Sequence, residues 1–207
     1  MEIMKLNPND VANRLKNGEG KICVVGLGRI GLPVACLFAN AGVEVVGVDK
    51  NLDLLESIKE ISSPFDEPGL RQLLENAVRQ GKLRVTCDLK EAASECSIII
   101  ITVSTLIDSS NKPDYTMLKD ACKEISLSLR CRSLVILEST VGPGFTESVV
   151  GKILGKPAKM KAGRDFGLVF CPIRASPGQV IADLIYYPRI IGGINDDSSK
   201  MAFEILS

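Results

Sequence analysis

Short apolar runs recur along the chain, and most of them are rich in β-branched residues and lack an alternation of apolar and polar positions. Runs of this kind are typical of strands that are covered on both faces, as in a parallel sheet. The clearest is 97–103, which contains four consecutive isoleucines. Strands are predicted at 21–25, 44–48, 83–86, 97–103, 134–137, 168–171 and 189–191.

Segments with helical periodicity lie between these runs. Helices are predicted at 9–16, 30–41, 52–59, 69–79, 115–129, 146–154 and 178–185. The segment 155–163, rich in Lys, Gly and Pro, is predicted to be a surface loop. The alternation of strands and helices predicts an α/β fold of the Rossmann type, with a doubly wound, mainly parallel sheet and helices on both faces.

The sequence divides into three predicted parts: an N-terminal helix and lead-in at 1–20, the Rossmann domain at 21–194, and the start of a connecting helix at 195–207. Asn195 begins a typical helix-start sequence. Apolar positions between Met201 and Leu206 then continue to the last residue, Ser207. We expect this helix to be cut short, with an exposed apolar stripe, in a fragment or a shortened gene product.

A glycine-rich turn joins the first predicted strand to the helix that follows it. Gly26, Gly28 and Gly31 have the GxGxxG spacing in the strand–turn–helix context that dinucleotide binding requires. Gly26 permits the tight turn, Gly28 lets the backbone approach a pyrophosphate, and Gly31 allows close packing of helix on strand. The N–H groups near Arg29 and Ile30 should face the diphosphate, aided by the helix dipole.

Asp49 ends the second predicted strand, about 20 residues beyond the turn as the fingerprint expects. Its carboxylate can accept hydrogen bonds from the adenosine ribose, whereas a 2′-phosphate would meet a like charge. NAD is therefore predicted over NADP, although the neighbouring Lys50 could soften that preference. The alternative is a glycine turn of purely packing value beside a solvated Asp49.

The composition excludes several kinds of partner, catalytic group and metal site. Lys plus Arg and Asp plus Glu both number 25, so the zero net charge favours neither nucleic acid nor an anionic membrane as a partner. The absence of histidine excludes a Ser-His-Asp triad, a Cys-His pair and a His-rich metal site, and no metal is predicted. The seven cysteines contain no CxxC pair and are interpreted as mostly buried free thiols. With no secretion leader and no apolar run near about 18 residues, the chain is expected in the cytoplasm.

Five stretches of the chain, taken in order, match one known family: 24–33, 48–51, 67–70, Leu137-Glu138-Ser139-Thr140-Val141, and Cys171-Pro172 through Pro177-Gly178. Together they resemble the UDP-sugar 6-dehydrogenases of the UDP-glucose/GDP-mannose dehydrogenase superfamily. The short helix before the first strand and the segment Arg174-Ala175-Ser176-Pro177-Gly178 look most like its N-acetylated branch, the UDP-N-acetylmannosamine and UDP-N-acetylglucosamine 6-dehydrogenases. The resemblance implies two-step oxidation of the sugar C6 alcohol to a carboxylate with two NAD, for surface polysaccharides.

The resemblance also implies roles for hydroxyl residues at two strand ends. Ser104 and Thr105 would lie along the cofactor, whereas Ser139 and Thr140 would approach the nicotinamide side. Thr140 would position a catalytic water or a substrate oxygen. The alternative for each hydroxyl is a helix cap or a turn hydrogen bond.

The chain departs from the family pattern in ways that affect catalysis. The family's cysteine nucleophile, which forms a thiohemiacetal with the aldehyde, belongs to a later domain, and none of the seven cysteines has matching surroundings. Ile173 stands where the family has an acid–base glutamate, Leu106 where it usually has proline, and Leu54 where a basic residue often holds the adenosine end. Losing a general base typically costs about 10²–10⁴ in rate.

Three functions are compatible with these observations. The first is the NAD-binding portion of a UDP-N-acetylhexosamine 6-dehydrogenase, inactive by itself towards UDP-sugar. The second is a degenerate, non-catalytic NAD-binding module that acts with a partner chain. The third, a hydroxyacid or 6-phosphogluconate dehydrogenase, is disfavoured by the matches at Glu138-Ser139-Thr140 and Pro177-Gly178. A UDP-sugar is expected as the substrate of the complete enzyme, and a homodimer or association with a missing C-terminal half is expected for this chain.

Overall fold

The computed structural model describes residues 1–207, the whole chain. The strands are β1 (Lys21–Val25), β2 (Glu44–Val48), β3 (Leu83–Thr86), β4 (Ile98–Ile101), β5 (Leu106–Ile107), β6 (Pro113–Asp114), β7 (Leu134–Leu137), β8 (Gly167–Phe170) and β9 (Gly192–Gly193). The helices are η1 (Ile3–Lys5), α1 (Pro8–Lys16), α2 (Gly31–Asn40), α3 (Leu52–Lys59), α4 (Leu70–Arg79), α5 (Leu89–Glu95), α6 (Thr116–Ser126), η2 (Thr146–Val150), α7 (Gly151–Gly155), α8 (Val180–Tyr186) and α9 (Asp196–Leu206).

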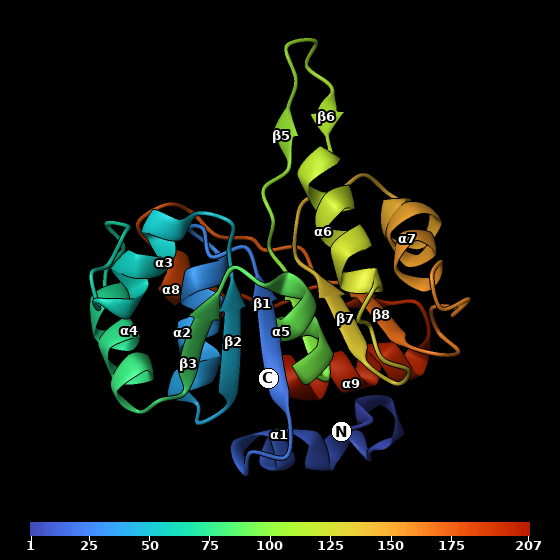
Figure 1. Ribbon diagram of the computed structural model, residues 1–207, viewed down its shortest axis with the longest axis horizontal. Coiled ribbons are helices and arrows are strands. Elements are labelled where there is room, and N and C mark those ends of the chain that lie inside the picture. Colours follow the sequence, from blue (N-terminus) through green and yellow to red (C-terminus); the bar gives the residue numbers. More distant parts are fainter.

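Seven strands form one sheet in the order β3-β2-β1-β4-β7-β8-β9, with helices on both faces (Figure 1). The first six strands are parallel, and only the short edge strand β9 is antiparallel to its neighbour β8. The order reverses between β1 and β4, and such a switch point opens a crevice outside the carboxyl ends of the two strands. The predicted doubly wound Rossmann sheet is confirmed.

Both faces of the sheet are apolar, which explains why the strands lack period-two alternation. In β4, Ile98 and Ile100 belong to the core under α1, α2, α4 and α9, while Ile99 and Ile101 belong to the core under α5, α6 and α7. All four isoleucines are fully buried. Four helices, α1, α3, α5 and α9, begin at a polar side chain that accepts a hydrogen bond from the first turn, which is worth about 1 kcal/mol per cap.

Several predicted boundaries are wrong. The strand predicted at 189–191 lies instead at Gly192–Gly193, because Arg189 turns its side chain inward to an ion pair with Glu138. The central strand ends at Ile101, two residues before its predicted end. Helix α5 was not predicted, nor was the hairpin formed by β5 and β6, whose exposed two-residue strands project beyond the rest of the domain (Figure 1).

Helix α9 packs on the same core as the sheet and α1. Met201, Ala202 and Ile205 are buried against that core, so the prediction of an exposed apolar stripe is wrong. The stripe needs a covering surface, and the lead-in helix α1 and the sheet provide it. Phe203 alone among the large residues of the stripe is mostly exposed. None of the helices is both long and apolar enough to cross a lipid bilayer.

Candidate functional site

The sheet register aligns the ends of four strands at one edge. Val25 of β1 pairs with Val48 of β2 and with Ile101 of β4, and Ile101 pairs with Leu137 of β7. The residues that follow, Gly26, Asp49, Thr102 and Glu138, therefore lie in one row at the carboxyl edge. Ligands of open α/β sheets bind at this edge.

The glycine turn is fastened to both neighbouring strands. Gly26 has a φ of 94°, a conformation that favours glycine, and its N–H donates to the Val48 carbonyl at 2.8 Å. A Cβ on Gly31 would lie 1.7 Å from the Gly26 carbonyl oxygen, so only glycine allows α2 to approach this closely. The Thr102 hydroxyl donates to the same oxygen at 2.7 Å. Sequence reasoning missed Thr102, although its place after four buried isoleucines marks it as the end of the central strand.

Four successive N–H groups of the turn are unpartnered. The N–H groups of residues 28–31 donate to no backbone or side-chain acceptor, whereas that of Leu27 donates to Asp49 Oδ2 at 2.7 Å. They lie at the N-terminus of α2, where the helix dipole adds to their attraction for an anion. The turn therefore has the donors and the field that a diphosphate requires.

Asp49 lies at the edge of the sheet and forms a hydrogen bond with the backbone of the glycine turn. Its Oδ2 binds Leu27 N–H, and its Oδ1 accepts from Asn51 N–H at 2.9 Å. A carboxylate has about four acceptor sites, so two remain for ligand hydroxyls. Lys50 is exposed, and its Nζ lies 4.0 Å from Glu124 Oε2 rather than against Asp49. The alternative of a merely solvated Asp49 does not agree with this geometry.

A pocket of about 290 Å³ opens at this row of residues. Among the predicted site residues, its lining includes Gly26, Gly28, Asp49, Lys50 and Ser104. A Cβ on Gly28 would meet no atom within 4 Å, which makes this glycine the open floor of the pocket. Sequence reasoning missed the other part of the lining, because it combines separate loops and helices: Cys87, Leu89, Met117, Asp120 and Ala121.

Arg29 and Ile30 of the turn point elsewhere. Arg29 is exposed, and its guanidinium lies 5.5 Å from the centroid of the Phe65 ring, a cation–π arrangement. Ile30 is partly buried against the apolar core. Neither residue lines the 290 Å³ pocket.

The predicted hydroxyl residues beyond Ser104 form a separate group at the ends of β4 and β7. Ser139 is buried, and its hydroxyl donates to the Val103 carbonyl at 2.6 Å, which ties the two strand ends together. The Thr105 hydroxyl donates to the Thr140 carbonyl at 2.8 Å. Thr140 is exposed, so its own hydroxyl is accessible. Thr105, Ser139 and Thr140 do not line the 290 Å³ pocket.

A buried ion pair lies directly before Ser139. Glu138 is buried, and its Oε1 accepts from Arg189 Nη1 at 2.8 Å, while Oε2 has no partner. Burial raises the pKa of Glu138 to about 7, although the Arg189 charge and hydrogen bond lower it. Burial and the nearby Glu138 charge also raise the pKa of Cys171. The pair fastens the segment before β9 to the carboxyl edge.

The three departures from the family pattern lie in different parts of the fold. Ile173 is partly buried and supplies no group for proton transfer, and Leu106 is mostly exposed on the hairpin. Leu54 packs against the core from α3. All seven cysteines are free thiols, and five of them, Cys23, Cys36, Cys96, Cys122 and Cys171, are buried as predicted.

Comparison with known proteins gives consistent matches. The model of the UDP-glucose/GDP-mannose dehydrogenase family, NAD binding domain, matches residues 20–207. The UDP-N-acetyl-D-mannosamine dehydrogenase of Methanocaldococcus jannaschii is 38% identical over 191 residues, which are 92% of this chain and 43% of that protein. The chain therefore spans less than half the length of this relative.

Solved structures agree with the sequence matches. The UDP-D-ManNAc dehydrogenase structure from Pyrococcus horikoshii superposes with a TM-score of 0.85 at 33% identity, over 90% of this chain and 44% of that one. The NDP-N-acetyl-D-galactosaminuronic acid dehydrogenase from Methanosarcina mazei gives a TM-score of 0.86 at 31% identity, over 98% of this chain and 44% of that one.

Proposed function

The chain belongs to the UDP-glucose/GDP-mannose dehydrogenase family, and from this premise we propose that it is the NAD-binding portion of a nucleotide-sugar 6-dehydrogenase. The substrate that we propose is a UDP-N-acetylhexosamine, since the relatives at 35–38% identity are named UDP-N-acetyl-D-mannosamine dehydrogenases. In the complete enzyme, the C6 alcohol is oxidised to a carboxylate with two NAD. The third possibility, a hydroxyacid or 6-phosphogluconate dehydrogenase, does not agree with this family.

The four free N–H groups of residues 28–31 carry the proposal, because they match a diphosphate at the start of a helix. In this proposal, Gly26 and Gly31 shape the turn, and the backbone of Arg29 and Ile30 donates to the phosphates. The remaining acceptor sites of Asp49 receive the adenosine ribose hydroxyls. Lys50 and Ser104 lie along the cofactor. NAD supplies the hydride acceptor when it is bound.

Thr140 is the catalytic candidate within the chain. It is exposed at the end of β7, next to the strand whose end lines the pocket. Its backbone is held by the Thr105 hydroxyl and by the buried Ser139 beside it. We assign Thr140 the positioning of a water or a substrate oxygen, and we assign Thr105 and Ser139 the support of that position on the nicotinamide side. The division of the chain at 20/21 and 194/195 stays a prediction.

The cofactor preference provides the first test. Asp49→Asn should weaken NAD binding about tenfold to a hundredfold, because charge-assisted hydrogen bonds net roughly 1.5–3 kcal/mol. The wild-type chain should bind NADP more weakly than NAD, since the 2′-phosphate meets the Asp49 charge. Calorimetric titration with both nucleotides measures this. Asp53→Asn, an exposed acid in the first turn of α3, is the matched control and should bind as wild type. Equal NAD affinity in Asp49→Asn and wild type would contradict the assignment.

Catalysis should require more than this chain. The chain covers 43–44% of the relatives, and Ile173 carries no acid–base group. We therefore expect no NADH production, measured by absorbance, when the chain is incubated with NAD and UDP-N-acetylmannosamine or UDP-N-acetylglucosamine. Detectable turnover would show that the second half of the enzyme is dispensable.

A non-catalytic NAD-binding module is the second candidate, and Ile173 is the observation that favours it. Both candidates predict NAD binding, so binding does not separate them. The variant Ile173→Glu separates the two candidates when the second half of a related dehydrogenase is supplied. If this position alone prevents chemistry, the variant should gain turnover. A module with another function should gain none.

A further inference from the structure

The lining of the cofactor pocket combines two kinds of surface. The glycine turn and Asp49 supply the polar groups, to which the diphosphate and the ribose are proposed to bind. Leu89, Met117 and Ala121 of α5 and α6 add apolar surface. In a dinucleotide the adenine base is joined to the ribose, so a ribose at Asp49 places the base against the part of the lining that the diphosphate leaves free.

One side of α6 reaches this pocket. Met117, Asp120 and Ala121 are spaced i, i+3 and i+4, so they lie on one side of the helix, and all three line the pocket. Ala121 is buried, whereas the side chain of Asp120 is 49% exposed. Helix α6 therefore offers the pocket an apolar surface with one carboxylate beside it.

The carboxylate of Asp120 has an oxygen to spare. Its Oδ1 accepts a hydrogen bond from Lys123 Nζ at 2.8 Å, and its Oδ2 accepts none from the protein. The hydrogen bond from Lys123 holds the pKa of Asp120 below its usual range, so the group is ionised at neutral pH. An ionised carboxylate accepts hydrogen bonds and donates none. Asp120 therefore offers the pocket an acceptor that cannot change into a donor.

The other polar side chains of the lining are less able to distinguish one base from another. The Lys50 ammonium group only donates hydrogen bonds, and the Cys87 thiol is weak both as a donor and as an acceptor. The hydroxyls of Thr102 and Ser104 are neutral and can either donate or accept. Asp49 is bound to the backbone of the turn and is proposed to bind the ribose. Asp120 is the acceptor that remains for the base.

Purine bases differ in the group at position 6. Adenine has an amino group there, which donates hydrogen bonds, whereas guanine and hypoxanthine have a carbonyl oxygen, which accepts them. A carboxylate beside position 6 attracts the amino group and repels the oxygen.

We infer that Asp120 is a specificity-determining residue, which accepts a hydrogen bond from the adenine amino group and disfavours dinucleotides whose base has an oxygen at that position. The inference rests on the proposed function, since it takes the position of NAD from the glycine turn and Asp49. It adds a second level of selection. Asp49 is proposed to select the ribose without a 2′-phosphate, and Asp120 selects the base.

The test compares NAD with nicotinamide hypoxanthine dinucleotide, in which an oxygen replaces the adenine amino group. In calorimetric titration, the wild-type chain should prefer NAD about tenfold, the lower end for a hydrogen bond to a charged group, because Asp120 is half exposed. Asp120→Ala should lose most of this preference through weaker NAD binding. Asp120→Asn should bind both nucleotides about equally, since its amide can accept from the amino group or donate to the oxygen.

Glu91→Gln is the matched control, because it removes an exposed carboxylate from α5 that does not line the pocket. It should keep the wild-type preference. Equal binding of the two nucleotides by the wild-type chain would overturn the inference, and this comparison needs no variant to fold. So would the full preference in Asp120→Ala. A wild-type chain that binds neither nucleotide would instead contradict the proposed function.

Discussion

Gly31→Ala should disrupt the glycine turn and abolish NAD binding, whereas Gly28→Ala should weaken NAD binding at least tenfold in a chain of normal stability. The added Cβ at position 31 would lie 1.7 Å from the Gly26 carbonyl oxygen and 2.5 Å from Thr102 Oγ1. Overpacking typically costs about 1–3 kcal/mol, and the upper end is expected because one obstacle is backbone. For a chain of this size, that lowers Tm on the order of 10 °C.

The Gly28→Ala variant separates the effect on NAD binding from any effect on stability. Its Cβ would meet no protein atom within 4 Å, so Tm should stay within a degree or two of the wild type. The same methyl group would occupy the approach of the diphosphate to the free N–H groups, and NAD affinity should fall at least tenfold. Differential scanning calorimetry and NAD titration measure both quantities.

Gly192→Ala in β9 is the matched control, because its Cβ would make an ordinary contact at 3.7 Å. It should retain both stability and binding. Wild-type NAD affinity in Gly28→Ala would show that the diphosphate does not lie over this glycine. Unchanged stability in Gly31→Ala would contradict the close approach of α2 to the turn.

Arg189→Met should destabilise the chain by about 3–5 kcal/mol near pH 8, because it leaves the Glu138 carboxylate buried without a partner. The loss should shrink towards pH 5. Burial raises the folded-state pKa of Glu138 to about 7 from its ordinary 4.5, so at pH 5 the folded wild-type chain already holds this carboxyl protonated. The arginine then has little charge to neutralise. Urea unfolding of both proteins at pH 5 and pH 8 measures the difference.

The stability of the wild-type chain should itself depend on pH through the same carboxyl group. A folded pKa above the unfolded value means that the folded state binds a proton that the unfolded chain has released. The stabilisation that protonated Glu138 adds to the free energy of unfolding is therefore fully present below about pH 4.5, and it is lost as the pH rises through about 7. Glu138→Gln should remove this pH dependence.

The double variant Glu138→Gln with Arg189→Met should recover part of the loss at pH 8, since no unpaired charge remains in the interior. An equal destabilisation by Arg189→Met at pH 5 and pH 8 would contradict the electrostatic explanation. The arginine would then act through the packing of its aliphatic stem.

Local patterns were sufficient to predict the fold class and the cofactor turn. A strand buried on both faces carries no charged or strongly polar residue at its buried positions. Strands β1 and β2 are buried after their first residue and β7 is buried throughout, so all three are visible in the sequence with their observed bounds. The turn is equally local, because the conformational freedom of glycine and the short distance to Asp49 are properties of one βαβ unit. The turn was expected at the same edge of the sheet as the hydroxyl residues that follow other strands, because the carboxyl ends of parallel strands share one edge.

Elements with weak local signals were predicted poorly. The hairpin strands β5 and β6 have two residues each and no buried face, so their pattern resembles a loop. Helix α5 is seven residues long and was hidden between two predicted strands. The strand at 189–191 was predicted from its isoleucines. In the structure, Arg189 instead forms a hydrogen bond with the carboxylate of Glu138, which is 51 residues away in sequence.

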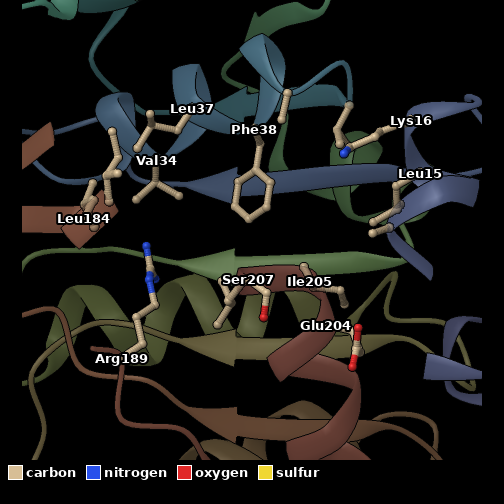
Figure 2. Close-up of a pocket in the computed structure, with 15 residues that line it drawn as sticks. Leu15, Lys16, Val34, Leu37, Phe38, Leu184, Arg189, Glu204, Ile205 and Ser207 are labelled. Carbon is tan, nitrogen blue, oxygen red and sulfur yellow. The ribbon is translucent and has the colours of Figure 1, made fainter. Parts of the chain in front are cut away.

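The sequence by itself determined the parallel Rossmann sheet and the dinucleotide turn, because both arise from residue patterns within about 30 positions of one another. Only the tertiary structure decided which groups meet across the sheet: Thr102 with the Gly26 carbonyl, Glu138 with Arg189, and the stripe of α9 with the core rather than with solvent. The apolar groove lined by Val34 and Phe38 of α2 and by Ile205 of α9 belongs to the same class (Figure 2). Its walls come from segments more than 150 residues apart, and no local pattern indicates that they are neighbours.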